Sequence, residues 1–174
     1  DYGMRGIAPD TLVGYEGFGG LSQFPAIASA NAAAAVGPGG IVQVTMEIPG
    51  PSTSAGCEGI HVNECNYVPG EWDESVFNAI KAAVDQGVIV IEAAGNGTVN
   101  LDHPSYNGKF DRAVRDSGAI LVSTGSSSGR YPLQWSNTGT RVDVHGWGEN
   151  VAALGGSVFY GADLWDGGEN ASYT

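Results

Sequence analysis

The strongest hydrophobic pattern in the chain is a run of four β-branched residues at 88–91, which directly follows Gly87. A continuous run of this kind is typical of a strand that is buried on both faces of a parallel sheet. Small residues follow it at 93–97, in the order Ala-Ala-Gly-Asn-Gly, and they cannot cover one another. We therefore predict a buried strand over 88–92 whose carboxyl end presents the amide of Asn96. A plain strand that ends in an Asn-Gly turn would show the same pattern.

The remaining apolar pattern alternates between strands and helices. An alanine-rich segment with Pro25 near its start and Gly37 after its end predicts a helix over 21–36. A second helix is predicted over 73–86, with Asp73 as its N-cap. Its apolar stripe consists of Val76, Phe77, Ile80, Ala83 and Val84. Further strands are predicted at 11–16, 41–47, 119–124 and 141–145.

This order of elements predicts an α/β fold for residues 1–174, which we interpret as one domain. The strand at 41–47, the helix at 73–86 and the strand at 88–92 form a βαβ unit, which normally has a right-handed crossover between parallel strands. We expect three layers, α/β/α, around a mainly parallel sheet. A long irregular segment is predicted over 49–71, and segments of that length are usually functional or cross-linked.

The charge balance excludes some partners. The 174 residues include 19 acidic and 7 basic side chains, for a formal net charge of −12, and no basic run occurs. A nucleic-acid partner is therefore not expected. No apolar run is long enough to span a bilayer, so we expect no membrane partner.

Several motifs resemble those of the subtilisin-like serine peptidases, or subtilases. The segment 93–96 is similar to the one that carries the oxyanion asparagine of that family. The resemblance extends over 73–98 and continues at 110–120, 135–137, 141–148 and 168–174, so it covers most of the chain. It implies a subtilisin-like α/β/α fold and a secreted serine endopeptidase that hydrolyses peptide bonds through an acyl-enzyme.

The resemblance also implies roles for individual residues. Asn96 would be the catalytic residue that donates a hydrogen bond to the oxyanion. Two groups would bind substrate: Thr45, Met46 and Glu47 along its backbone, and Ala93, Ala94 and Gly95 as one wall of the specificity pocket. Since Thr-Met-Glu-Ile at 45–48 replaces the usual family pattern S-L-G-G, no substrate specificity is predicted. A plain core strand would explain the apolar residues at 41–47 equally well.

The motifs of the catalytic triad are absent from the sequence, because it contains neither H-G-T nor G-T-S. We therefore interpret the chain as the central portion of a peptidase domain, and we predict that this segment alone is inactive. Its partners would be a protein or peptide substrate and the remaining segments of its own domain. Asp143 and His145 share one face of a predicted strand, and we favour a hydrogen-bonded surface pair over part of a triad.

The cysteines and acidic loops suggest structural roles. The short spacing between Cys57 and Cys65 allows a local disulfide, which would fit an oxidising compartment and a mostly secreted family. A metal pair with His61 lacks the usual C-x-x-C spacing. No cofactor is required for the chemistry, and a structural calcium ion would fit the family without a defined site. Candidate calcium ligands are Asp102, Asp111, Asp116 and Asp163.

Two other classes of function remain open from the sequence. One is a non-catalytic α/β binding module that keeps the peptidase scaffold. The other is a small-molecule-binding α/β domain that uses the glycine-rich ends of its strands. Reading the open reading frame on both sides for H-G-T and G-T-S-x-A would separate the peptidase from the binding module.

Overall fold

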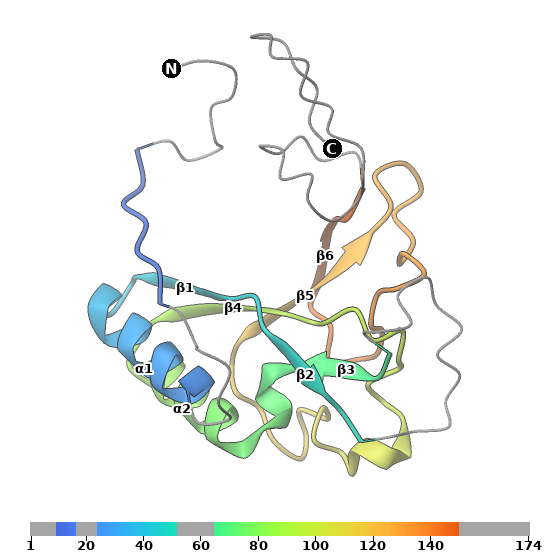
Figure 1. The fold of residues 1–174 in the computed structure, drawn as a ribbon, viewed down its shortest axis with the longest axis horizontal. Helices are drawn as coiled ribbons and strands as arrows, with labels where there is room; N and C mark the ends of the chain where they lie inside the picture. Colours follow the sequence, from blue (N-terminus) through green and yellow to red (C-terminus); the bar gives the residue numbers. More distant parts are fainter. Residues whose placement is uncertain (1–9, 17–23, 52–64, 150–174) are drawn as a thin grey trace, which may run out of the picture.

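A four-stranded parallel sheet forms the centre of the computed structural model, which describes residues 10–16, 24–51 and 65–149 (Figure 1). The strand order is β1-β4-β5-β6, and each neighbouring pair is parallel. A separate antiparallel pair joins β2 to β3. The strands are β1 Ile41–Val44, β2 Glu47–Pro49, β3 Tyr67–Pro69, β4 Ile89–Ala93, β5 Ile120–Gly125 and β6 Val144–Trp147. The predicted α/β class with a mainly parallel sheet is confirmed.

Two α-helices, α1 Phe24–Val36 and α2 Glu74–Asp85, pack against the same face of the sheet (Figure 1). Asp73 caps α2 as predicted, because its carboxylate accepts hydrogen bonds from the backbone N–H groups of Ser75 and Val76 at 2.9 and 3.2 Å. Val76, Ile80 and Ala83 of the predicted apolar stripe are buried against β1 and β4, and Val84 is half-buried beside them. Two short 3₁₀ helices, η2 Gly70–Trp72 and η3 Pro104–Tyr106, complete the described helices. None of the helices in the described ranges is long and apolar enough to cross a membrane.

The other face of the sheet carries exposed aliphatic side chains. Ile41 and Ile89 are paired in register and are 60 % and 45 % exposed, and Ile120 and Val144 are 40 % and 48 % exposed. Parallel sheets are normally covered by helices on both faces. Within residues 10–16, 24–51 and 65–149, the two α-helices supply only one of the two helical layers that we expected.

The predicted strand over 41–47 is divided in two. β1 ends at Val44, and the chain then leaves the parallel sheet so that Glu47 pairs with Pro69 of β3. Between these strands the side chain of Met46 turns into the core, where it is 4 % exposed. The segment that we predicted to be irregular over 49–71 therefore contains β3 and part of η2. The sequence pattern did not indicate this pairing, because β2 and β3 each contain only three residues.

Two other predicted strands also differ from the structure. Residues 10–16 form no strand, and Leu12, Val13 and Tyr15 are about nine-tenths or more exposed, so these side chains are not packed against the described core. The strand predicted at 141–145 instead begins at Val144, because the preceding residues are used in polar contacts. Arg141 is buried in an ion pair, and the carboxylate of Asp143 accepts the backbone N–H of Leu121 at 2.8 Å.

Buried charges lie between η2, β4 and the segments that lead into β5 and β6. The guanidinium of Arg141 donates to both carboxylate oxygens of Glu71 at 2.8 and 3.1 Å. Glu92 of β4 is fully buried, and its Oε1 accepts the backbone N–H of Glu71 at 2.9 Å. Its Oε2 has no hydrogen-bond partner among the described residues. Burial, together with the nearby charge of Glu71, raises the pKa of Glu92 well above its ordinary value.

This pKa shift predicts how stability depends on pH. The folded protein keeps a proton on Glu92 that the unfolded chain releases above its ordinary pKa of 4.5, so the free energy of unfolding falls as the pH rises from there through the folded-state pKa. Glu92→Gln removes this titration. The difference between the free energy of unfolding of the variant and that of the wild type should therefore increase as the pH rises above 4.5.

Denaturant unfolding between pH 4 and 8 measures this difference. The control is Glu16→Gln, the same chemical change at an exposed acidic side chain of the segment 10–16, and its profile should stay parallel to that of the wild type. Parallel profiles for Glu92→Gln and the wild type would contradict a raised pKa at this position.

Candidate functional site

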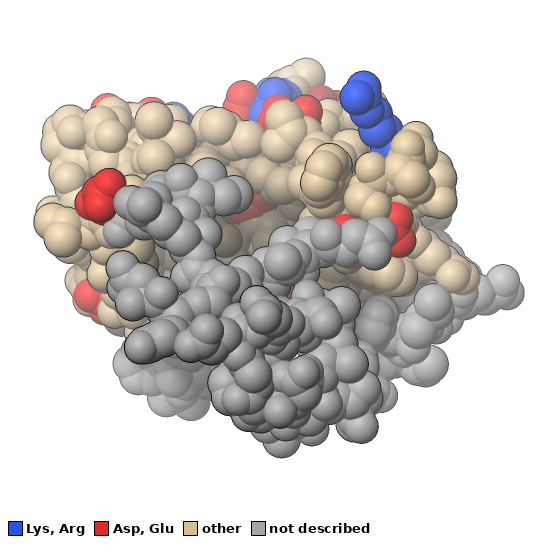
Figure 2. Space-filling model, turned by 90° about the horizontal axis from the view of Figure 1, so that it is seen from above, with Lys and Arg blue, Asp and Glu red and all other residues tan. Residues whose placement is uncertain are grey.

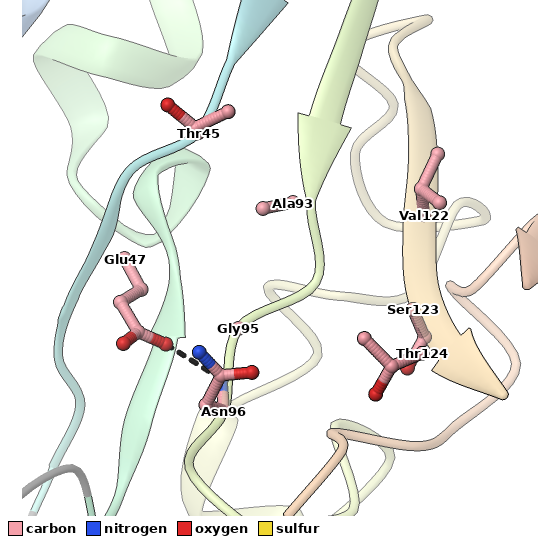
Figure 3. Close-up of a pocket in the computed structure, with 8 residues that line it drawn as sticks. All are labelled: Thr45, Glu47, Ala93, Gly95, Asn96, Val122, Ser123 and Thr124. Carbon is pink, nitrogen blue, oxygen red and sulfur yellow. Dashed lines mark hydrogen bonds between the residues drawn. The ribbon is translucent and has the colours of Figure 1, made fainter. Parts of the chain in front are cut away.

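A pocket lies at the carboxyl ends of β1, β4 and β5, where open α/β sheets usually bind ligands (Figure 3). It brings together five of the seven predicted catalytic and substrate-binding residues. These five are Thr45, Glu47, Ala93, Gly95 and Asn96. β1 and β4 stay paired only as far as Val44 and Glu92, so the segments beyond them diverge and enclose the pocket.

Asn96 is half-buried, and its side-chain amide points into this pocket between Glu47 and Thr124 (Figure 3). Its backbone N–H donates a hydrogen bond to Oε2 of Glu47 at 2.6 Å. Within the described part of the chain, the side-chain amide forms no hydrogen bond. A fixed backbone with an available N–H₂ group is the arrangement that can donate to a ligand oxygen.

Asn137 holds the turn that carries Asn96. Its side chain is completely buried, and Nδ2 donates to the carbonyl oxygens of Ala94 and Tyr67 at 2.7 and 2.8 Å. Its Oδ1 accepts the backbone N–H of Val99 at 3.0 Å, and its own backbone N–H donates to the carbonyl of Gly95 at 3.1 Å. The turn is therefore held on both sides of Asn96 by one residue that is distant in sequence.

The glycines on either side of Asn96 are required by close packing. Gly95 has a φ of +89°, and a Cβ atom there would lie 2.8 Å from Nδ2 of Asn137 and 3.1 Å from Oε2 of Glu47. A Cβ at Gly97 would lie 2.0 Å from the carbonyl oxygen of Tyr67 in β3. The small residues of the sequence motif thus allow β3 and two polar side chains to approach the turn.

Three further lining residues, Val122, Ser123 and Thr124, were not predicted from the sequence. They lie at the carboxyl end of β5, and β5 is the parallel neighbour of β4. The expected adjacency of β4 and β5 could have indicated these residues from the sequence, because parallel neighbours end at the same edge of a sheet. Ser123 is buried, donates to the backbone carbonyl of Asn137 at 2.7 Å and contacts the hydroxyl of Ser136. Its hydroxyl is therefore engaged in holding β5 to the segment around Asn137.

Two of the predicted substrate-binding residues do not line the pocket. Met46 belongs to the core cluster beneath β1 and β4, and Ala94 is fully buried in the second cluster, beneath β4 and β5. Side chains alternate between the two faces of an extended segment, so Thr45 and Glu47 reach the pocket while Met46 turns away from it. The same alternation separates Ala93 from Ala94.

The predicted pair of Asp143 and His145 is not formed in the described structure. The carboxylate of Asp143 accepts hydrogen bonds from Arg112 at 2.5 Å and from Arg141 at 3.0 Å. His145 lies exposed on β6. Asp143 therefore anchors the segment that precedes β6.

The candidate calcium ligands that the structure describes are engaged in hydrogen bonds within the protein. Asp102, Asp111 and Asp116 each accept a hydrogen bond from a nearby backbone N–H. Across the described ranges, no group of three or more His, Cys, Asp or Glu residues is arranged to hold a metal ion. Asp163 lies outside the described residues. Cys57 also lies outside the described residues, so its disulfide with Cys65 stays a prediction.

Comparison with known proteins gives no further assignment. No protein-family model matches the chain, and no curated protein matches it. The functional interpretation therefore depends on the sequence motifs and on the geometry of this pocket.

The contacts of Asn137 predict a large effect on stability and on the turn. Asn137→Ala leaves two carbonyl groups and one N–H without their buried partner, so the free energy of unfolding should fall by about 2–4 kcal/mol. In this variant, the rate of amide hydrogen exchange at 94–99 should increase relative to the wild type by more than the rate in β4 does. Asn78→Ala, at an exposed position of α2, should change stability by less than about 0.5 kcal/mol.

Chemical unfolding and hydrogen exchange measure the two effects separately. If exchange at 94–99 accelerated no more than exchange throughout the sheet, Asn137 would stabilise the fold as a whole without a specific effect on the turn.

Proposed function

We propose that the chain is the central portion of the catalytic domain of a secreted subtilisin-like serine endopeptidase. The observation that carries this proposal is the position of Asn96. Its side-chain amide points into a pocket at the carboxyl end of a parallel strand, on a turn that is fixed by Asn137 and Glu47. The sequence around it also resembles the oxyanion segment of the subtilases.

The proposed chemistry is peptide-bond hydrolysis through an acyl-enzyme. When a nucleophile attacks the scissile carbonyl, the carbonyl oxygen becomes negatively charged and is stabilised by donors already directed at it. Asn96 would supply one such donor from its side chain. The nucleophile, the base and the orienting acid would come from other segments of a longer parent protein, and the chain alone would be inactive.

The geometry also suggests how a peptide would bind. The segments at 45–47 and 93–95 diverge beyond the last paired residues of β1 and β4 and enclose the pocket. An extended substrate could form main-chain hydrogen bonds beside these segments, while one side chain enters between them. Ala93 and Gly95 leave room for that side chain because they are small.

The exposed face of the sheet fits a peptidase domain that has further segments. Ala93 and Val122 line the pocket and are register partners, on the same face as the exposed Ile89 and Ile120. In the view from above, many of the visible charged side chains lie along the edge of the described surface, and acidic atoms are also visible in the hollow near its middle (Figure 2). We propose that the remaining segments of the domain cover this face and bring the nucleophile to the pocket. No cofactor is required for this chemistry, and calcium would have a structural role.

The function is tested in the full-length protein by peptide cleavage and by labelling with a fluorophosphonate probe. Asn96→Ala should lower kcat by roughly 10²–10³-fold, a magnitude known from this family of peptidases, with a smaller effect on KM. Asn78→Ala is the matched control, because it removes the same side chain from an exposed position of α2.

The outcome separates the two main interpretations. A full-length protein with no reactive serine and no cleavage would favour a non-catalytic binding module that keeps the scaffold. Cleavage that is unaffected by Asn96→Ala would place the oxyanion donor elsewhere.

A further inference from the structure

Two buried carboxylates, those of Glu71 and Glu92, lie near a single guanidinium. Arg141 donates to both carboxylate oxygens of Glu71 at 2.8 and 3.1 Å, and it also donates to Asp143 at 3.0 Å. Glu92 has no such pairing in the described structure. Its Oε1 accepts the backbone N–H of Glu71 at 2.9 Å, and its Oε2 has no hydrogen-bond partner among the described residues. A negative charge on Glu92 would therefore be poorly compensated.

Gly70 of η2 packs tightly against both the Met46 side chain and the Glu92 carboxylate. A Cβ atom at Gly70 would clash with Cε of Met46 and would lie 3.3 Å from Oε1 of Glu92. Met46 is 4 % exposed, and Glu92 is fully buried. From this side, water can reach the carboxylate only if η2 and the Met46 side chain separate.

Met46 also connects this contact to the pocket. It lies at the corner between β1 and β2, directly before Glu47, and β2 pairs with β3, which is followed at once by η2. Oε2 of Glu47 accepts the backbone N–H of Asn96 at 2.6 Å. A movement that separated η2 from Met46 would therefore displace the wall of the pocket that Glu47 forms.

We propose that a proton on Glu92 keeps the corner between β1 and β2 closed, and that loss of this proton at higher pH opens the corner. The charged groups that act on Glu92 are Glu71 of η2 and Arg141 of the segment before β6. The corner and the start of α2 contribute the apolar side chains of Met46 and Val76 next to Gly70. Glu71 opposes a charge on Glu92 and Arg141 is already paired, so only water could stabilise the ionised form.

The dependence on pH follows from proton linkage. The closed corner holds the proton on Glu92, while the open corner exposes the carboxylate to water and returns its pKa toward the ordinary value of 4.5. The population of the open form should therefore rise by up to about tenfold per pH unit above 4.5, and it should level off above the raised pKa of the closed form.

Oxidation of Met46 by hydrogen peroxide measures this opening. The thioether accepts one oxygen atom from peroxide and water is released, and the buried sulfur must first become accessible. In the full-length protein, peptide mass spectrometry gives the rate of sulfoxide formation at Met46 between pH 5 and 9. The rate should rise with pH by up to about tenfold per unit and then level off. N-acetylmethionine amide, oxidised in parallel, corrects for the reagent.

Two variants assign the effect to Glu92. Glu92→Gln cannot lose a proton, so its rate of Met46 oxidation should not vary with pH. Glu16→Gln, the same change at an exposed side chain of the segment 10–16, should keep the wild-type profile. A rise in Glu92→Gln equal to that of the wild type would overturn the inference. If Glu92→Gln does not fold, the wild type still decides, because a rate independent of pH would also overturn it.

Denaturant separates opening of the corner from unfolding of the whole protein. A local opening exposes little surface, so low concentrations of urea should barely change the rate of Met46 oxidation, while they should accelerate amide hydrogen exchange in β5. Equal sensitivity of the two rates to urea would show that Met46 is exposed only by global unfolding and would overturn the inference. None of these measurements uses peptide cleavage, so their outcome is independent of the proposed function.

Discussion

The buried guanidinium of Arg141 links the segments on which the described fold depends. It pairs with Glu71 just before α2, donates to the carbonyl of Ala119 just before β5, and contacts Asp143 just before β6. Moving these charges out of water is unfavourable, so such a pair is weak evidence for a net gain in stability. Its directional hydrogen bonds join the segment before α2 to the segments before two strands. The neutral form of Glu92 is part of this arrangement, since a second buried negative charge beside Glu71 is unfavourable.

At the other end of the sheet, Asn137 fixes the turn after β4 in the same way that Arg141 fixes the strand starts. Both residues are fully buried, and both lie in irregular segments after β5. Their partners are mainly backbone groups and acidic side chains that are 20 to 70 residues away. The pocket and the starts of the strands are therefore positioned by long-range polar contacts, while the formation of the helices is indicated by local apolar patterns. This division explains which features could be predicted from the sequence.

The apolar periodicity predicted the parallel sheet, α2 with its cap at Asp73, and the position of Asn96 at the end of β4. Those features depend on residues that are neighbours in sequence. The pairing of β2 with β3, the late start of β6 and the role of Asn137 could not be predicted in this way. Each depends on a contact with a distant segment, and β2 and β3 contain only three residues each. The alternation that places Glu47 in the pocket and Met46 in the core also depends on where β1 ends, and the strand pattern at 41–47 did not indicate that position.

The contact between Glu47 and Asn96 holds the turn that presents the Asn96 side chain to the pocket. A turn that presents an amide to a ligand needs its backbone N–H groups satisfied, or the turn will relax to satisfy them. Oε2 of Glu47 satisfies the N–H of Asn96 itself, which leaves the side-chain amide as the group directed into the pocket.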